Sequence, residues 1–319
     1  CVGCHEHRAR APRTAAVELE ALRHPPSFPK EIPNTPDVLD FPRDIQPILD
    51  NHCVECHCPE RRDGAVDLTG DRTARYSMAY WTMQTRGLVA DGRNRDKSNY
   101  DPYRIGSAAS RLMEFLDGSH HGAKLSDHET TMIRLWIETS ACYPGTYASL
   151  GSGYFPMSAI NYGAVSNRCG SCHVFDSPDK KRKVVKFGNS WGGRIEPLTN
   201  ISRPEKSYLL LAPLAKEAGG LELCGVATFK DTADPMYQGI LASLQDAHRR
   251  LTQEKRFDMP GFRPNEHYIR EMQRFGFLPE DLKPGDPVDC YAVDRAYWDS
   301  FSYQPDARTG GKAHHPKLE

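Results

Sequence analysis

Two stretches in the first half of the chain carry helical signals. Within residues 42–57, apolar side chains recur at helical spacing and predict a short helix that leads into a cysteine-containing string. Its apolar face consists of Ile45, Ile48 and Leu49. Farther along, Ser126-Asp127-His128-Glu129 has the spacing of a capping box, in which the serine and glutamate side chains satisfy backbone N–H groups at a helix start. We therefore predict a second helix that begins at this box and ends before Pro144.

The second half has two further helical signals. Asp234 is a predicted N-cap, and Pro235 suits the first helical position because it has no N–H group to leave unpaired. Apolar residues then follow at helical spacing, in the clearest pattern of the chain. They are Tyr237, Ile240, Leu241, Leu244 and Leu251, and His248 shares their face. A last helix, capped by Asn265, is predicted to carry His267.

Between these helices the chain is rich in residues that interrupt regular structure. Residues 6–40 contain six prolines and little periodicity, which predicts an extended segment with one short helix at most. A loop rich in glycine and aspartate follows the first predicted helix, and a glycine-rich stretch at 151–163 is the expected linker between two domains. We divide the chain into a wrapper at 1–40, domains at 41–150 and 151–305, and a flexible tail at 306–319.

Charge and hydropathy exclude two classes of partner. The 319 residues include 41 Lys and Arg against 42 Asp and Glu, so the formal net charge is −1 at pH 7. A chain without excess positive charge gains little from counterion release, so nucleic acid is not an expected partner. No apolar run approaches the ~20 residues that a bilayer requires, so no membrane span is expected either.

Ten cysteines and thirteen histidines are the unusual feature of the composition. Six of the cysteines lie in three C-x-x-C-H strings, Cys1-Val2-Gly3-Cys4-His5, Cys53-Val54-Glu55-Cys56-His57 and Cys169-Gly170-Ser171-Cys172-His173. In c-type haem attachment, two such thiols bond to the porphyrin vinyl groups and the following histidine is the proximal ligand of the iron. The strings predict three covalently bound haem c groups with His5, His57 and His173 as proximal ligands.

This cofactor content sets the expected fold class. We expect a mainly α protein with much irregular structure, a multihaem cytochrome c wrapped around three covalent haems. The loop after the second string contains three aromatic residues that are then expected to line a porphyrin. They are Tyr76, Tyr80 and Trp81.

Two other uses of C-x-x-C pairs fit this sequence less well. A tetrahedral zinc site needs two pairs close together, whereas these pairs lie far apart and each precedes a histidine. A thioredoxin-like motif would occur once, without the trailing histidine. Covalent haem attachment takes place outside the cytoplasm, so we expect a periplasmic or other extracytoplasmic protein. Because the chain opens directly on a haem motif, we expect a signal peptide or further sequence upstream.

A low-spin electron-transfer haem has a second axial ligand, whereas a catalytic haem leaves that position open. For the second haem the candidates are His120 and His121, in a loop before the capping box, and we favour His120. For the third haem we favour His267, in the first turn of its helix, over His248, whose imidazole would be costly to bury without a partner. The alternative for each is a solvated histidine or a core histidine bonded to a carbonyl group.

The first haem has the least defined distal side. His24 is the nearest candidate ligand in the proline-rich segment, and otherwise the axial position is open or filled by another chain. No methionine is assigned as a ligand, because most of the eight lie on apolar faces. We therefore expect the first haem to be the most accessible of the three.

Four cysteines lie outside the haem strings. They are Cys58, Cys142, Cys224 and Cys290. An even number of cysteines in an oxidising compartment predicts one or two disulfides among three possible connectivities, and free buried thiols are the alternative.

Several longer strings carry a family resemblance. They are FPRDIQPIL at 41–49, GAVDLTGDR at 64–72, GSH at 118–120, NISRPE at 200–205, APLAKEAGG at 212–220 and KRFDMPGFRP at 255–264. Over roughly residues 1–305 the chain resembles the multihaem C-terminal region of hydrazine synthase alpha-subunit-like proteins. The resemblance implies a subunit of a haem complex in which the first haem is five-coordinate and acts on a small nitrogen species.

The function expected from the sequence is that of an extracytoplasmic triple-haem cytochrome c that relays electrons between redox partners. Three covalent haems on one chain of this length must lie close together, and such groups pass electrons in succession. A catalytic subunit of the implied complex is the first alternative, and a haem-conducting unit of a larger assembly, including self-assembly, is the second. The expected partners are redox proteins or further subunits of a haem complex, and an electron-transfer protein is favoured over a self-contained oxidoreductase.

Overall fold

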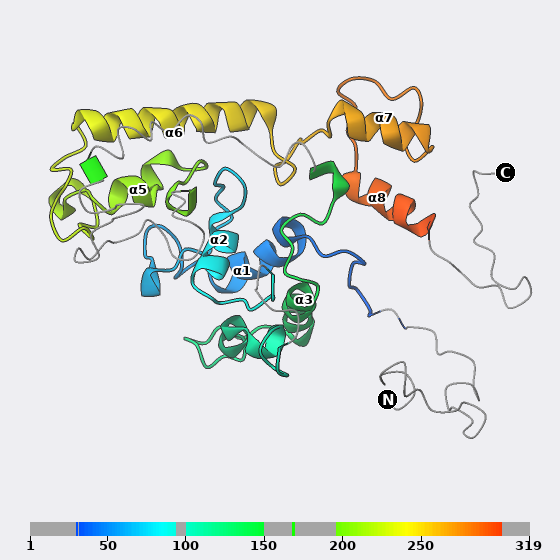
Figure 1. Ribbon diagram of the computed structural model, residues 1–319, viewed down its shortest axis with the longest axis horizontal. Helices are drawn as coiled ribbons and strands as arrows, with labels where there is room; N and C mark the ends of the chain where they lie inside the picture. The colour runs from blue at the N-terminus through cyan, green and yellow to red at the C-terminus, as the bar shows by residue number, and fades with distance from the viewer. Residues whose placement is uncertain (1–29, 31, 94–99, 150–167, 170–195, 302–319) are drawn as a thin grey trace, which may run out of the picture. The chain divides into compact units, whose positions relative to one another are not determined.

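Helices joined by long irregular segments make up the structure, a computed structural model (Figure 1). It describes residues 30, 32–93, 100–149, 168–169 and 196–301. The chain divides into two compact units, Cys1–Asp37 and Val38–Glu319. Within the described part of the second unit the fold is mainly helical with much irregular structure, as predicted, and extended segments pair only in isolated bridges.

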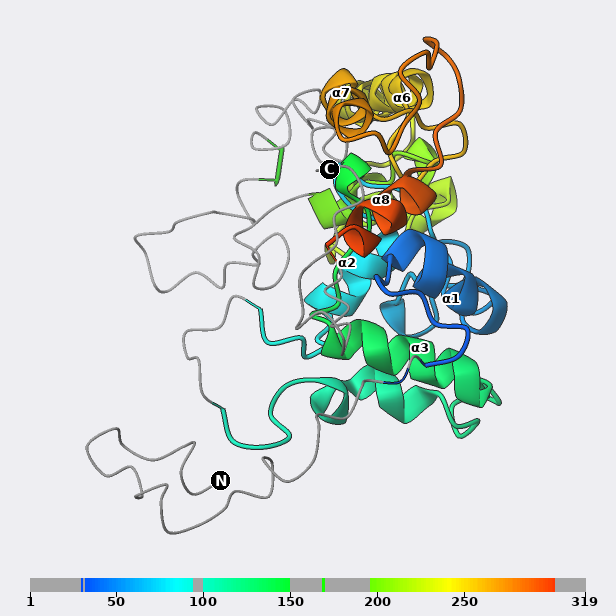
Figure 2. The same cartoon turned by 90° about the vertical axis from the view of Figure 1, so that its right-hand side faces the viewer.

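The predicted helix before the second cysteine string is present and short. A π-helical turn, η4 (Phe41–Ile45), runs directly into α1 (Gln46–His52), and the side chain of Asp40 caps the turn by accepting a backbone N–H. Helix α3 (Asp127–Glu138) packs against η4, and the two views place α3 beside α1 (Figures 1 and 2). Cys53 follows α1 directly and is its C-cap residue, so this helix sets the position of the second cysteine string.

Helix α3 (Asp127–Glu138) confirms the predicted capping box. The Ser126 hydroxyl accepts the Glu129 N–H at 3.2 Å, and the Glu129 carboxylate accepts the Ser126 N–H at 2.9 Å. The buried face of the helix consists of Met132, Ile133, Trp136 and Ile137. Each of these contacts is local, which is why the sequence pattern is sufficient to place this helix.

Helix α2 (Met78–Thr85) occupies a segment predicted as loop. The predicted porphyrin lining is wrong for two of its residues, because Tyr80 and Trp81 are only 3% and 2% exposed and are covered by protein atoms. The Tyr80 hydroxyl donates to the Ala141 carbonyl at 2.9 Å, and the Trp81 indole N–H donates to the Thr73 hydroxyl at 3.0 Å. These aromatic rings therefore fill the protein core.

The helices of the second half are α5 (Tyr208–Leu211), α6 (Pro235–Glu254), α7 (Glu266–Arg274) and α8 (Cys290–Asp299). The predicted caps are confirmed, since Asp234 accepts the Met236 N–H at 2.8 Å and Asn265 accepts the Tyr268 N–H at 2.9 Å. Short 3-10 turns lie at Asp63–Ala65, Ser107–Ala109, Arg111–Phe115, Tyr147–Ser149, Glu196–Leu198, Pro204–Lys206 and Lys216–Ala218. None of the described helices combines the length and the apolar character of a membrane span.

Three hydrophobic clusters form the core of the described residues. The first gathers residues of η4, α1, α2, α3 and the segments between them and includes Phe257, and the second is built mainly from α5 and α6 and includes Ala74. The third is built mainly from α7 and α8 and includes Ala148. Each cluster thus contains a residue from the other side of the predicted boundary near residue 150, so the described segments on either side of it pack as one unit.

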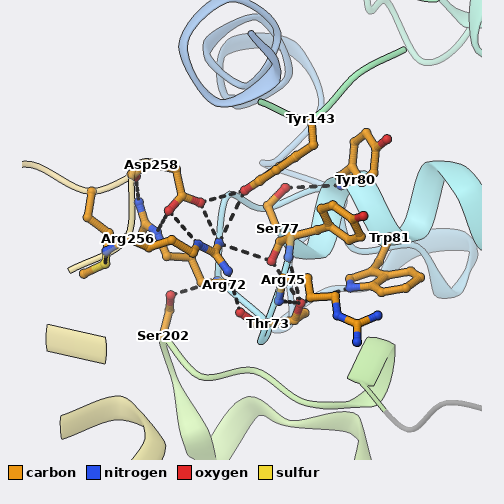
Figure 3. A network of polar contacts seen from close by, with 12 residues as sticks. Arg72, Thr73, Arg75, Ser77, Tyr80, Trp81, Tyr143, Ser202, Arg256 and Asp258 are labelled. Atoms are coloured by element: carbon orange, nitrogen blue, oxygen red, sulfur yellow. Dashed lines mark hydrogen bonds and ion pairs between the residues drawn. The ribbon is translucent and has the colours of Figure 1, made fainter. Parts of the chain in front are cut away.

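A buried polar network links the same two halves. Figure 3 shows the Asp258 carboxylate between the Arg256 guanidinium and the Tyr143 hydroxyl, with donor–acceptor distances of 2.6 to 2.7 Å. Arg256 also donates to the Thr73 carbonyl at 2.8 Å. Burial favours protonation of Asp258, but the charge and hydrogen bonds of Arg256, together with the charge of Arg72, lower its pKa to about 2. The carboxylate is therefore ionised at neutral pH.

Candidate functional site

The second C-x-x-C-H string forms a tight turn that continues α1. The Cys53 N–H donates to the Leu49 carbonyl at 2.8 Å, and the His57 N–H donates to the Cys53 carbonyl at 3.0 Å. Cys53 and Val54 pack against the first hydrophobic cluster, and Cys56 is half-buried. The turn therefore holds both thiols and the His57 imidazole in one short segment at the edge of the core.

A hydrogen bond to the backbone fixes the His57 ring. Its Nδ1 atom lies 2.9 Å from the Asp63 carbonyl oxygen, and because a carbonyl only accepts, Nδ1 carries the proton. The loop that supplies this carbonyl is tied back to the string, since the Asp63 N–H donates to the Cys56 carbonyl and the Leu68 N–H donates to the His57 carbonyl. The Nε2 lone pair is left available, which is the arrangement typical of a metal-ligating histidine.

The protonation state of His57 agrees with this role. Burial lowers the pKa of the imidazole, the bond to the Asp63 carbonyl opposes that effect, and the nearby His120 lowers the pKa again. The neutral form is therefore favoured at neutral pH, and only a neutral imidazole offers a lone pair to a metal.

His120 lies at the tip of a narrow turn. Asp117 and Lys124 form an antiparallel bridge at its base, and the Gly118 N–H donates to the Ala123 carbonyl at 3.0 Å. Gly118 has a φ of +97°, a conformation that a side chain would strain, so glycine is required for the chain to turn here. The bridge and this hydrogen bond close the turn that carries His120.

The same hydrophobic cluster anchors both sides of the site. Leu116 and Leu125, which flank the His120 turn, are buried in the cluster against which Cys53 and Val54 pack. Phe115 also packs against this cluster, and its ring lies 4.9 Å from the His120 ring. The two histidine-bearing segments are thus held in a common frame, although they lie far apart in the sequence.

The result is a pair of facing imidazoles. The ring centres of His57 and His120 are 5.9 Å apart, and the ring planes differ by 9°. Two imidazoles that bind one metal through bonds of about 2 Å, with about 1 Å from nitrogen to ring centre, have centres about 6 Å apart. The separation of the two ring centres therefore equals that expected for two histidines on one iron, and the two ring planes are nearly parallel.

The chemistry of Cys53 separates this site from a thioredoxin-like one. Burial, with a smaller contribution from the Cys56 thiol, raises the pKa of Cys53 to about 11. A nucleophilic redox cysteine needs a lowered pKa, because the thiolate is the reactive form.

The described residues contain no cluster of three or more histidine, cysteine or acidic side chains suited to a bare metal ion.

One positioning contact was not found from the sequence. The His52 Nε2 atom lies 3.0 Å from the Glu129 carboxylate, and both side chains are about three-quarters buried. This contact ties the last residue of α1, next to Cys53, to the capping box of α3. The capping box itself was visible in the sequence, but its long-range partner had no local signal.

Comparison with known proteins gives no match: no family model, no curated protein and no solved structure is similar to the chain. The resemblance to hydrazine synthase alpha-subunit-like proteins therefore stays a prediction, as do the activity and complex that it implies.

The first and third haem strings are mostly outside the described residues. Cys1, Cys4, His5, His24, Cys172 and His173 all belong to the part of the chain that the structure does not describe, as does the short helix expected in the proline-rich segment. Cys169 is half-buried and packs against the second hydrophobic cluster. The preceding Arg168 donates to the Thr228 carbonyl and pairs with Asp234 at 3.2 Å. The third string therefore begins beside the N-terminal end of α6.

The two candidate ligands of the third haem lie in different surroundings. His267 is exposed on α7, and its Nδ1 atom faces the Arg270 guanidinium at 3.0 Å. His248 is half-buried on α6, and its Nδ1 atom lies 2.8 Å from the Ile201 carbonyl, the same type of contact that His57 makes. Cys169 packs in the cluster of α6, whereas α7 belongs to the third cluster. The ligand of the third iron stays a prediction.

The predicted disulfides are not formed. Cys58, Cys142 and Cys290 each have a free thiol, and every pairing among the four remaining cysteines would use at least one of these three. Cys142 is exposed after α3, whereas Cys290 is buried at the start of α8. The alternative of a free buried thiol applies to Cys290, where burial, then the charges of Asp294 and Asp289, raise the pKa to about 12.

Proposed function

We propose that the chain is a c-type cytochrome that relays electrons, and that its second haem is held by Cys53 and Cys56 with His57 and His120 as axial ligands. The observation that supports this most directly is the pair of imidazoles, 5.9 Å apart and within 9° of parallel, beside a C-x-x-C-H turn. The sequence independently predicts one member of this pair, His57, as an iron ligand.

The residues of the site favour electron transfer over ligand activation. With His57 and His120 both bound to the iron, no axial position would stay open for a substrate. The Asp63 carbonyl holds the proton of His57 on Nδ1 and so leaves the Nε2 lone pair available to a metal. The haem, when bound, supplies a one-electron couple, and the protein sets its potential through ligand type and burial.

The same proposal extends to the whole chain on the strength of its sequence. The strings at Cys1–His5 and Cys169–His173 have the same spacing, so we infer three covalent haems and a relay among them. An extracytoplasmic location and redox-protein partners belong to this proposal, because covalent attachment requires the machinery outside the cytoplasm. No contact among the described residues favours the catalytic alternative.

The test begins with the full chain produced together with a cytochrome c maturation system. Intact mass should exceed the polypeptide mass by three haems, and the ferric protein should have a low-spin spectrum for the second haem. His120→Ala should convert one haem to a high-spin form while the number of haems bound, read from the intact mass, stays at three. His128→Ala is the matched control, because this exposed histidine lies in α3 and is not among the rings in contact with His57 or His120 in the described residues. A chain that binds fewer than three haems, or a His120→Ala spectrum identical to the wild type, would refute the proposal.

A further inference from the structure

The two imidazole planes at the second site are held by different kinds of contact. A hydrogen bond fixes the His57 ring, because rotation about its Cβ–Cγ bond would break the 2.9 Å contact between Nδ1 and the Asp63 carbonyl. No hydrogen bond of the His120 ring is found among the described residues. Its ring instead contacts two further aromatic rings, with ring centres 4.9 Å away for Phe115 and 4.8 Å away for His121.

Of these two neighbours, only Phe115 has a rigid base. Phe115 is half-buried, ends the 3-10 turn Arg111–Phe115, and packs against the first hydrophobic cluster. His121 is exposed and lies at the tip of the same turn as His120, so it moves with the ring that it would have to hold. The core-anchored ring is therefore the contact that limits rotation of His120.

We propose that Phe115 is a positioning residue that holds the His120 ring parallel to the His57 ring, and so sets the electronic ground state of the second haem. This inference rests on the proposed function, since it needs the two histidines to bind one iron. The 9° angle between the ring planes is the observation that the proposal explains.

The ring angle has a direct spectroscopic consequence. Two parallel imidazoles direct their π orbitals at the same iron d orbital, so the two upper dπ orbitals differ in energy. A ferric haem of this type has a rhombic electron paramagnetic resonance spectrum with three resolved g values. Crossed imidazoles act equally on both orbitals, and the spectrum is then dominated by one feature at a larger g value.

The experiment uses the full chain with its haems attached. The signal of the second haem is identified as the low-spin component that disappears in His120→Ala. In the wild type this component should be rhombic. In Phe115→Leu, which keeps apolar packing but removes the flat ring, it should broaden and shift toward the large-g form. Phe115→Tyr should restore the wild-type spectrum, because it keeps the ring.

Phe262→Leu is the matched control. Phe262 is another half-buried phenylalanine that packs against the first cluster, with no ring contact to His120. It should leave the spectrum unchanged. A wild-type component of the large-g form, or equal spectra for the wild type and Phe115→Leu, would overturn the inference while leaving the relay intact. If His120→Ala instead keeps every low-spin component of the wild type, His120 is not an iron ligand and the proposed function of the site is refuted.

Discussion

Replacing Asp258 with Asn should destabilise the fold strongly, because the carboxylate is the shared acceptor of the network that joins the two halves. Arg256 donates to it at 2.7 and 2.6 Å and Tyr143 donates at 2.7 Å, and the Arg256 and Asp258 side chains are only 1% and 2% exposed. An amide keeps one acceptor oxygen and turns its NH₂ group toward a donor. Arg256 is then a buried cation without its counter-charge.

The size of the effect follows from two estimates. The fall in the pKa of Asp258 from 3.8 to about 2 corresponds to about 2 kcal/mol of stabilisation of the ionised form. Removing one partner of a buried ion pair costs about 3–5 kcal/mol, since the other charge stays buried. We therefore expect Asp258→Asn to lower the free energy of unfolding by about 3–5 kcal/mol at pH 7.

Urea unfolding followed by far-ultraviolet circular dichroism measures this loss. Asp246→Asn is the matched control, because Asp246 also pairs with two arginines, Arg249 and Arg250, but its side chain is 46% exposed. Such exposed pairs contribute about 1 kcal/mol at most. Equal losses in the two variants would refute the reasoning.

The pH dependence supplies a second check on Asp258. Its pKa is lower in the folded protein than in the unfolded chain, so its contribution is complete above about pH 4 and is lost as the pH falls toward 2. The difference between the wild type and Asp258→Asn should therefore shrink by about 2 kcal/mol between pH 5 and pH 2. A difference that is independent of pH would show that the ionised carboxylate is not the stabilising form.

Three further predictions concern other parts of the chain. His120→Met should leave the second haem covalently bound and raise its reduction potential, because a thioether stabilises ferrous iron relative to an imidazole. A redox titration with the wild-type potential would point to His121 as the ligand. Burial raises the pKa of Asp40 to about 6, so the folded state takes up a proton that the unfolded chain releases. The free energy of unfolding of the wild type should therefore rise relative to that of Asp40→Asn as the pH falls from 6 to 4. Urea unfolding measures both values, and a difference between them that does not change with pH would contradict the prediction. Carbon monoxide should bind the first haem before the other two, more readily still in His24→Ala, and binding only at the second or third haem in both proteins would exclude an open first site.

The helices that the sequence predicted correctly are those whose signals are local. In α3, α6 and α7 a capping side chain lies within three residues of the N–H it accepts, and one apolar face alternates with a polar one. The sequence pattern did not predict α2, because this helix is buried on nearly all sides. It therefore lacks the alternation of apolar and polar positions that marks a helix with one exposed face. Helix α8 has a capping Asp289, but few of its residues are buried, so its apolar signal is weak.

The candidate site divides in the same way. In c-type haem attachment the spacing of the two cysteines and the histidine is set by the two vinyl groups and the iron of one porphyrin, so the five residues Cys53–His57 were enough to make that prediction. From the sequence, the second ligand of the same haem could be narrowed to two neighbouring histidines, His120 and His121. Only the tertiary structure places the His120 ring centre 5.9 Å from that of His57, with the two ring planes nearly parallel.

The remaining features of the site depend on contacts that no sequence pattern encodes. The acceptor for His57 is a backbone carbonyl, which every residue possesses, so its position at Asp63 follows from the path of the loop alone. The contact of Phe115 with His120 and that of His52 with Glu129 arise because segments distant in the sequence share one hydrophobic cluster. Residue types determine which chemistry is possible in this chain, whereas the packing of the core determines which of those residues meet.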